Sequence, residues 1–461
     1  MVFSSIIFLI FFLPAFFILY YAVPAKAKNA VLLLASLIFY AWGEPKYIIL
    51  LVISSVVDYI NGRMMEKFDG KDKIRKIFLV ISVVINLSLL GIFKYSGLFI
   101  DTLNLIPSLN IPNPGLPLPI GISFFTFQTM SYSIDVYRRE VKAEHNSLNY
   151  MTYVSMFPQL IAGPIVRYKD VGKELASRKI SFENVTSGFI RFGMGLFKKV
   201  LIANGIGQLW DCCLESVSSL SFATAWLGAA AFSFKIYFDF SGYSDMAIGL
   251  GKMMGFDYPE NFNYPYTADS VTDFWRRWHI TLSSWFKSYV YIPLGGSRKS
   301  DLRTVFNLAV VWALTGFWHG ASWNYLLWGA FFAVILILEK FVFAKLLSKT
   351  PSALKHIITL FLILVSWVIF AVEDFSSMGL YLKSMFSFSG GITDPLFIYS
   401  LRNYGLILAV ATVLSMPVYP KLRKKIKGLE WAKCIVFALL FIISVVFLVK
   451  NTYNPFLYFR F

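Results

Sequence analysis

Four histidines are the residues of this sequence best suited to proton transfer, and their surroundings differ. His319 lies in the run TGFWHGASWNYLLWG, between two apolar stretches. The preceding stretch, 304–318, would rise about 22 Å as a helix, which is less than the hydrocarbon thickness of a bilayer. A helix of that length would leave His319 inside the membrane, where an ionisable group is costly. Burial there favours the neutral imidazole that a general base needs. The alternative is a histidine that packs against a neighbouring helix.

A second histidine, His279, lies in the run FWRRWHITLSSWFKSYVYIPLGG. Arg276 and Arg277 precede it, and Trp275 and Trp278 alternate with them. Adjacent arginines suit a phosphate-bearing molecule such as coenzyme A or a phosphopantetheine arm. The alternative is an interfacial helix that extends its arginines toward water and is anchored by tryptophan.

The other two histidines have simpler settings. His145 lies in the polar run AEHNS, which predicts a solvated surface residue. His356 begins an apolar run beside Lys355, which predicts a position at a membrane interface. Near His319, Gly316 and Gly320 offer room for a substrate chain to approach.

Charged residues also occur in the apolar run KIYFDFSGYSDMAIGLGKMMGF, which contains Lys235, Asp239 and Asp245. Lys235 and Asp239 share one helix face, so the spacing predicts an ion pair between them. Charges inside a membrane also mark ion paths, and this run is therefore the best sequence evidence for a transporter.

Several familiar catalytic patterns are absent. No histidine is followed five positions later by aspartate, and the sequence has no G-x-S-x-G, H-E-x-x-H or P-loop run. The three cysteines, Cys212, Cys213 and Cys434, have no metal-ligand spacing, and no metal site is expected. Serine hydrolases, zinc proteases and nucleotide-driven pumps therefore lose support.

The elements that must position these residues are membrane helices. Hydrophobic residues make up 57% of the 461 residues and charged residues only 15%, so lipid is the expected solvent. The net charge of +17 would otherwise suggest nucleic acid, but the basic residues cluster in short loops between apolar runs. The candidate spans are 4–23, 29–43, 46–60, 77–99, 119–136, 186–210, 222–251, 304–318, 322–344, 356–372, 403–419 and 434–450.

The loops between the spans predict an orientation. Segment 61–76 holds six basic residues and segment 101–119 holds none, which predicts that the first is cytoplasmic and the second external. Arg138, Arg139 and Lys142 then fall inside, as does the basic run 421–427. The first span lacks a preceding positive charge and is followed by Lys26 and Lys28, so we expect it to be retained. Alternation places both termini outside.

Two segments do not read as simple spans. Residues 150–166 are apolar but have basic residues at both ends, and Pro158 and Pro164 would break a straight helix. We expect a re-entrant segment, whose backbone must be buried in protein or line a wet cavity. Residues 256–303 are rich in Trp, Tyr and Arg, which predicts amphipathic helices and loops at the cytoplasmic interface.

The sequence resembles the membrane-bound O-acyltransferase (MBOAT) family, in the branch of the alginate O-acetylation membrane proteins (AlgI-like). The matching runs follow in order over nearly the whole chain: MVFSS, LPIGISFFTFQTMSYSIDVYR, FPQLIAGPIVR, YFDFSGYSDMAIGLGKMMGF, FWRRWHITLSSWFKSYVYIPLGG, GFWHGASWNYLLWG and NPFLYFRF.

The resemblance implies an all-α polytopic membrane fold, with about 11–12 transmembrane helices plus re-entrant and amphipathic helices around a central tunnel. We expect one membrane domain over 1–461. Its parts are the N-terminal spans 1–136, the re-entrant segment 150–166, the donor region 256–303, the catalytic-histidine helices 304–344 and the C-terminal spans 356–461.

The resemblance also assigns site residues. The family's essential histidine corresponds to His319, and a less uniformly required one corresponds to His279. The residues expected to contact substrate are Trp275, Arg276, Arg277, Trp318 and Asn324.

The implied activity is O-acylation, most simply O-acetylation of an exported or cell-surface polysaccharide. The donor would be acetyl-CoA or an acyl-carrier thioester on the cytoplasmic side of the cell membrane, with no permanently bound cofactor. The expected partners are an extracytoplasmic acetyltransferase resembling SGNH esterases, polysaccharide and membrane lipid, with no nucleic acid. The alternatives are D-alanyl transfer to a cell-wall polymer, an ion or glycan transporter, and a scaffold without chemistry.

Overall fold

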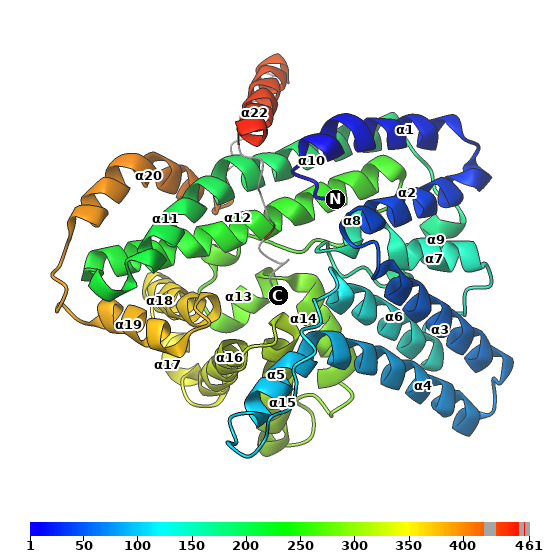
Figure 1. The fold of residues 1–461 in the computed structure, drawn as a ribbon, viewed down its shortest axis with the longest axis horizontal. Coiled ribbons are helices and arrows are strands. Elements are labelled where there is room, and N and C mark those ends of the chain that lie inside the picture. Colours follow the sequence, from blue (N-terminus) through cyan, green and yellow to red (C-terminus); the bar gives the residue numbers. More distant parts are fainter. Residues whose placement is uncertain (419–429, 451–455, 457–461) are drawn as a thin grey trace. The chain divides into compact units, whose positions relative to one another are not determined.

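The structure, a computed structural model, describes residues 1–418, 430–450 and 456 (Figure 1). Within these ranges the regular secondary structure is helical, without β-strands, as the sequence predicts. The basic run 421–427, expected on the cytoplasmic side, lies outside the described residues. So does the C-terminal NPFLYFRF run, apart from Phe456.

The chain divides into two compact units. Unit 1 comprises Met1–Phe192 and Tyr243–Pro259, and unit 2 comprises Gly193–Gly242 and Glu260–Phe461. Two helices contribute residues to both units: α10 (Phe182–Phe197) and α12 (Phe222–Met254).

Unit 1 is a helical assembly in which α3, α4 and α6 pack against one another. Its helices are α1 (Leu13–Ala22), α2 (Lys28–Gly43), α3 (Ile48–Lys67), α4 (Asp72–Leu90), α5 (Ser96–Leu103), α6 (Ile122–Tyr137), α7 (Ser147–Ser155), α8 (Phe157–Leu160) and α9 (Tyr168–Ala176). The π-helical turn η1 (Ile7–Phe12) leads into α1, and another, η3 (Gly91–Tyr95), joins α4 to α5.

Unit 2 has its tightest helix pair in α15 and α16, with α18 packed on α16. Its helices are α11 (Asn204–Glu215), α13 (Val271–Arg277), α14 (Ile280–Phe286), α15 (Asp301–His319), α16 (Trp323–Phe341), α17 (Ala344–Lys349), α18 (Ser352–Ala371), α19 (Phe375–Phe386), α20 (Pro395–Leu414) and α22 (Glu430–Lys450).

Helices suited to a bilayer occur in both units. Among the described residues, five are long and apolar enough to cross a membrane by length and composition: Ile48–Lys67, Asp72–Leu103, Trp323–Phe341, Ser352–Ala371 and Pro395–Leu414. Large apolar side chains stay on their surfaces, including Val84, which is 54% exposed, and Leu406, which is 82% exposed. Such surfaces need lipid around them, and an all-α polytopic membrane protein is therefore confirmed.

Each expected span lies on a helix, but several boundaries differ. Helix α3 continues to Lys67 and α4 begins at Asp72, so most of segment 61–76 is helix rather than loop. Helix α20 begins at Pro395, several residues before the expected 403. Its start carries a recognisable signal, because Asp394 accepts a hydrogen bond from the Phe397 amide and proline occupies the first turn.

Segment 150–166 forms two short helices rather than one span. Helices α7 and α8 have nine and four residues, and the helical conformation is interrupted between them at Met156. Pro158 lies in the first turn of α8, where its missing N–H costs nothing. The Phe157 amide donates to Ser36 Oγ at 3.1 Å, and almost the whole segment is buried within unit 1. This burial agrees with the requirement for irregular backbone at membrane depth.

Segment 256–303 differs from the expected surface-lying amphipathic helices. From residue 271 onward most of its aromatic side chains, Phe274, Trp275, Trp278 and Trp285 among them, are buried in unit 2. Its helices α13 and α14 have only seven residues each. The tryptophan residues of this segment therefore pack in the core of unit 2 and do not anchor a helix at the membrane interface.

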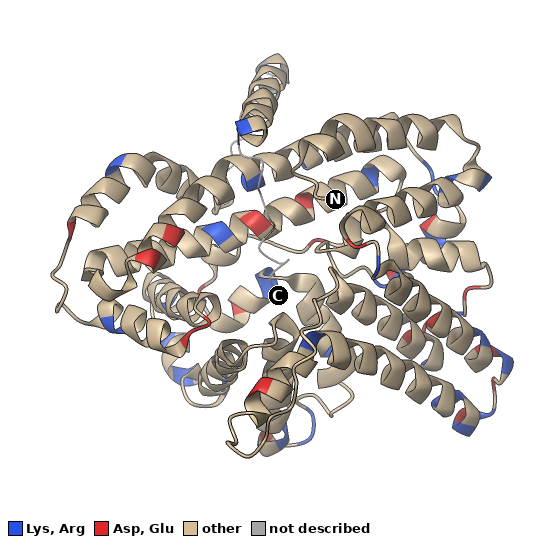
Figure 2. Ribbon diagram, viewed as in Figure 1, with Lys and Arg blue, Asp and Glu red and all other residues tan. Residues whose placement is uncertain are grey.

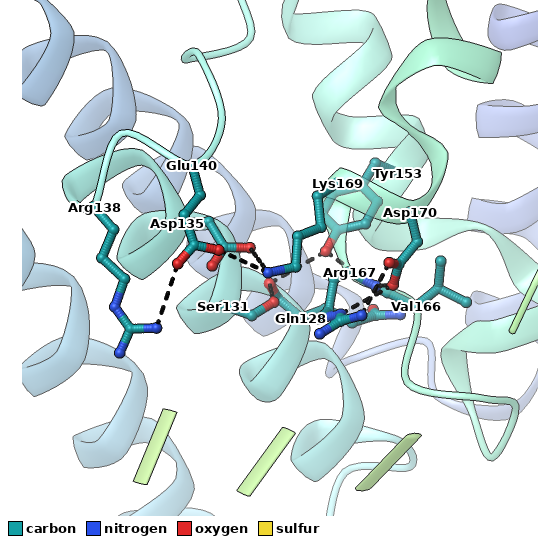
Figure 3. A network of polar contacts seen from close by, with 10 residues as sticks. All are labelled: Gln128, Ser131, Asp135, Arg138, Glu140, Tyr153, Val166, Arg167, Lys169 and Asp170. Carbon is teal, nitrogen blue, oxygen red and sulfur yellow. Dashed lines mark hydrogen bonds and ion pairs between the residues drawn. The ribbon is translucent and has the colours of Figure 1, made fainter. Parts of the chain in front are cut away.

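Charged residues are frequent where helices of unit 1 end (Figure 2). At the end of α6, the fully buried Asp135 lies 3.6 Å from Lys169 Nζ, which also lies 2.8 Å from Glu140 (Figure 3). Arg138 approaches the same Glu140 carboxylate at 3.8 Å. The hydrogen bond from Lys169 holds the pKa of Glu140 below its usual value. This network fastens the α6–α7 connection to α9.

Candidate active site

His279 lies at the junction of two short helices in unit 2. Helix α13 ends at Arg277 and α14 begins at Ile280, so His279 separates them with a left-handed φ of +43°. This conformation is uncommon for a residue with a side chain and is typical of sites where structure is held for function. The imidazole is fully buried, with the Phe240 ring centroid 4.7 Å away.

A hydrogen bond fixes the orientation of this imidazole. His279 Nδ1 lies 3.1 Å from Oδ1 of Asn261, a buried residue from the chain before α13. The same oxygen accepts hydrogen bonds from the Thr281 hydroxyl at 2.9 Å and from the Thr281 amide at 3.4 Å.

His319 is the last residue of α15 and is surrounded by aromatic rings. Its imidazole is 3% exposed and has the Trp318 and Trp328 centroids at 5.0 Å and the Phe370 centroid at 5.4 Å. These rings come from α15, α16 and α18. The aromatic surroundings exclude bulk water, which strengthens any electrostatic interaction made there.

Trp318 links the two histidines. Its ring centroid lies 5.0 Å from that of His319 and 5.8 Å from that of His279. The two imidazoles also interact electrostatically. The structure therefore brings both predicted catalytic histidines into one buried neighbourhood of unit 2.

Longer helices hold α13 in place. Ser270 caps its N-terminus by accepting from the Asp273 amide, and the Glu339 carboxylate of α16 accepts from the amides of Val271 and Thr272. These bonds satisfy N–H groups that have no partner inside the helix. His356 at the start of α18 donates from Nδ1 to the Ala268 carbonyl at 2.9 Å. Helices α16 and α18 therefore position the segment that carries His279.

The glycines near His319 do not create open space, contrary to the expectation from sequence. A Cβ on Gly316 would lie 2.3 Å from the Tyr325 carbonyl oxygen, and one on Gly320 would lie 2.2 Å from the Tyr325 ring. A Cβ on Gly329 of α16 would lie 2.4 Å from the Trp312 carbonyl oxygen of α15. These residues let the α15 and α16 backbones approach closely, which is their usual role between membrane helices.

The length argument for the depth of His319 also changes. Helix α15 has 19 residues, because Ser300 caps it and Asp301 begins it. It would rise about 28 Å, close to the hydrocarbon thickness, so length alone does not place His319 within the membrane. The burial of the imidazole among aromatic rings is the stronger observation.

The residues of α13 that are expected to contact substrate have different surroundings. Trp275 is buried against Trp312 and Phe332, at centroid distances of 4.7 and 4.9 Å. Arg277 forms an ion pair with Asp273 at 2.8 Å, whereas Arg276 is exposed. A phosphate contact from both arginines together therefore has no support in this geometry.

Asn324 lies in the first turn of α16 and has a structural task. Its Nδ2 donates to the carbonyls of Phe370 at 2.9 Å and Ile369 at 3.3 Å, at the end of α18. It thereby satisfies helix-end carbonyls that have no intrahelical partner. Its assignment as a substrate contact stays a prediction, as do those of Trp275, Arg276, Arg277 and Trp318.

The predicted Lys235–Asp239 ion pair is wrong. Lys235 pairs with Asp211 of α11 at 3.0 Å, and Asp239 pairs with Lys199 of the π-helical turn η4 (Lys198–Ala203). Side chains on neighbouring helices compete with the i,i+4 partner, and in this protein the partners on neighbouring helices form the ion pairs. Figure 2 shows residues of both signs along α12.

The second acidic residue of this run is paired as well. Within unit 1, Asp245 accepts hydrogen bonds from Arg191 of α10 at 2.9 and 3.0 Å. His145 is exposed, as predicted, and lies 2.7 Å from Glu66.

Sequence reasoning missed several residues around the histidines: Phe240, Asn261, Trp328 and Phe370. Asn261 precedes His279 by 18 residues in a run, ENFNYPY, that resembles an ordinary loop. The aromatic residues resemble membrane-helix packing in sequence. Neither carries a local signal, because their relevance depends on contacts across the fold.

Comparison with known proteins decides the family. Residues 89–378 match the model of the membrane-bound O-acyltransferase family. The chain belongs to this family. The matched range contains both histidines and all the helices that surround them, so this MBOAT protein is an O-acyltransferase.

Relatives of this MBOAT protein include O-acetylating enzymes. It is 42% identical over 392 residues to the "probable alginate O-acetylase AlgI" of Pseudomonas aeruginosa, covering 84% of this chain and 75% of that one. It is 36% identical over 500 residues to the protein of the same name from Azotobacter vinelandii, covering both chains fully. It is 37% identical over 425 residues to a peptidoglycan O-acetyltransferase of Helicobacter pylori, covering 85% and 80%.

Proposed function

We propose that this MBOAT protein is an O-acetyltransferase that passes an acetyl group from a cytoplasmic thioester donor toward an exported polysaccharide. The observation that carries the proposal is the pair of buried imidazoles, His279 and His319, whose ring centroids lie 5.8 and 5.0 Å from that of Trp318. The names of the relatives support acetyl as the group and polysaccharide as the destination.

His319 acts as the general base. In its neutral form the imidazole removes the proton of an acceptor hydroxyl, and the oxygen attacks the thioester carbonyl. The carbon–sulfur bond breaks and a carbon–oxygen bond forms. The imidazolium returns its proton to the departing thiolate, so an ester and a free thiol are the products. Its dry aromatic surroundings favour the neutral imidazole and keep water from competing for the acetyl group.

The donor is acetyl-CoA or an acyl-carrier thioester. Arg276 is the residue suited to its phosphate, because it is exposed while Arg277 is paired with Asp273. The immediate acceptor is a bound intermediate or a separate extracytoplasmic transferase, which completes delivery to the glycan. In this proposal the protein lies in the cell membrane with its donor side facing the cytoplasm.

A transporter is less well supported. Its evidence was the charge of Lys235, Asp239 and Asp245, and each of these residues has an ion-pair partner on a neighbouring helix. Paired charges that join helices explain the residues without an ion path. D-alanyl transfer would need a general base of the same kind, and the chemical identity of the transferred group separates it from acetylation.

The test is His319→Ala in cells that carry the full chain. We expect insertion and abundance to be unchanged and ester-linked acetate on the surface polysaccharide to fall to the level of cells without the protein. Acetate is measured after mild alkaline release. Retained acetylation by His319→Ala would remove the proposed function, and released D-alanine in place of acetate would change the group transferred.

A further inference from the structure

Asn261 makes an unusual set of contacts around His279. Its side-chain oxygen accepts from Thr281 Oγ1 at 2.9 Å and from the Thr281 amide at 3.4 Å, and lies 3.1 Å from His279 Nδ1. Its backbone carbonyl accepts from the Ile280 amide at 3.0 Å. One buried residue therefore binds the ring of His279 and the backbone of the two residues after it.

These contacts determine which atom of the amide faces the histidine. A backbone N–H is always a donor, so the Thr281 amide requires an oxygen and not the NH₂ group of Asn261. Oxygen accepts only, so Nδ1 of His279 must bring the hydrogen. The hydrogen-bond network thus assigns neutral His279 its proton on Nδ1 and its basic lone pair on Nε2.

The backbone of His279 needs the same support. A left-handed φ of +43° is strained for a residue with a side chain, and persists only where its surroundings enforce it. Two backbone hydrogen bonds hold the junction from its C-terminal side. The Ile280 amide donates to the Asn261 carbonyl, and the Ser283 amide donates to the His279 carbonyl. Relaxation of this junction would move the imidazole away from Trp318.

We propose that Asn261 is a positioning residue that fixes His279 as the Nδ1–H tautomer, so that Nε2 is the ring atom that accepts a hydrogen bond from the reacting groups while His319 removes the proton of the acceptor hydroxyl. This inference rests on the proposed function. It corresponds to a general design in which a second group, hydrogen-bonded to one ring nitrogen, sets the chemistry of the other. Around His279, His319 is the titratable neighbour, and Asp239, next to Phe240 on α12, is paired with Lys199.

The test compares Asn261→Leu with Asn261→Asp in the full chain. Membrane vesicles from the producing cells keep the native acceptor, and thiol release from added acetyl-CoA measures turnover across a range of pH. The amount of folded protein is measured by size-exclusion profile in detergent. Each variant is also combined with His279→Ala.

Asn261→Leu removes the acceptor, so we expect turnover per folded molecule to fall by about 100-fold, as when a histidine loses its orienting partner. Asn261→Asp keeps an acceptor for all three donors, so we expect turnover within about tenfold of the parent. Its carboxylate also stabilises the imidazolium, so half-maximal turnover requires a higher pH. On the His279→Ala background, Asn261→Leu should have little further effect, because the group it positions is gone.

Asn307→Leu is the matched control. Asn307 is a buried asparagine of α15 that donates to the Gly296 carbonyl at 2.8 Å. None of its described hydrogen bonds involves His279 or His319. It undergoes the same chemical change, so we expect less folded protein but the same pH profile per folded molecule.

Three outcomes would each overturn the positioning role. Asn261→Leu could keep full turnover, or it could lower turnover on the His279→Ala background by the same factor as in the parent. The third is an unshifted pH profile of Asn261→Asp. Where Asn261→Leu does not accumulate, the pH profile of Asn261→Asp decides. The proposed function fails separately, when His319→Ala retains turnover. An inactive His319→Ala together with an unshifted Asn261→Asp profile overturns only the role of Asn261.

Discussion

The side chains around His279 and His319 show how differently two buried asparagines are used. Asn261 approaches an imidazole, whereas Asn324 donates to the last carbonyls of α18. Both are almost fully buried, and both lie in runs rich in aromatic residues. Only their partners distinguish them, and the partners predict different consequences of substitution.

Asn324→Leu should lower stability rather than turnover. The change leaves the Ile369 and Phe370 carbonyls without their donor in a buried place, at a cost of about 1–3 kcal/mol. We expect a lower thermal unfolding midpoint in detergent and unchanged acetylation per folded molecule. A large loss of turnover with an unchanged unfolding midpoint would instead support the predicted substrate contact.

Helix pairs in this protein are defined by close backbone approach and by ion pairs between helices. Gly316 and Gly329 let α15 approach α16 closely, and this contact places His319 beside Trp328. The buried pair of Lys199 and Asp239 joins η4 to α12. Neither feature follows from the amphipathic pattern of one helix, because each depends on the neighbour.

Gly316→Ala should separate α15 from α16. The new Cβ would lie 2.3 Å from a carbonyl oxygen that cannot rotate away, so we expect a loss of about 1–3 kcal/mol and reduced acetylation. Gly379→Ala in α19 is the control, since a Cβ there meets nothing within 4 Å. It should be neutral or stabilising by about 0.5–1 kcal/mol. Equal unfolding midpoints for the two variants would refute the close approach.

Asp239→Leu should be strongly destabilising, by about 3–5 kcal/mol, because it removes the carboxylate that pairs with the buried charge of Lys199. Lys199→Met combined with Asp239→Leu should recover much of the loss, since both charges are then absent. Unfolding of purified protein in detergent measures both effects. A double variant as unstable as Asp239→Leu would argue that the carboxylate has a task beyond pairing.

The orientation of the whole chain in the membrane is still a prediction from the distribution of basic residues. The long apolar helix Asp72–Leu103 separates the turn between α3 and α4 from the uncharged loop that follows α5. If this helix crosses the bilayer, the two connections lie on opposite sides. The excess of positive charge then assigns the α3–α4 turn to the cytoplasm.

Cysteine labelling tests this orientation. In a variant without Cys212, Cys213 and Cys434, Lys71→Cys should react with a membrane-impermeant maleimide only after the cells are opened. Asn110→Cys, in the external loop, should react in intact cells; both positions are exposed. Labelling of Lys71→Cys in intact cells would show that the orientation is opposite to the predicted one and that the proposed donor side faces outward.

Much of the architecture could be predicted because helical membrane segments are a local property. Twenty or so apolar residues must form a helix in lipid, and caps such as Asp394 with Pro395 mark where one begins. The neighbourhood of His319 was also recognisable, because an ionisable residue between apolar runs is rare. The boundaries of α3, α4, α15 and α20 were less predictable, since polar turns extend helices beyond their apolar part.

The sequence by itself determined that this is a helical membrane protein and that His279 and His319 are its best candidates for chemistry. Tertiary structure decided what holds them: the bond between Asn261 and His279, the aromatic rings around His319, and the use of Gly316 for packing rather than for substrate. It also gave Asp239 the partner Lys199 in place of Lys235. The physical reason is that these interactions join residues far apart in the chain, whereas sequence patterns report only what neighbours along one helix can do.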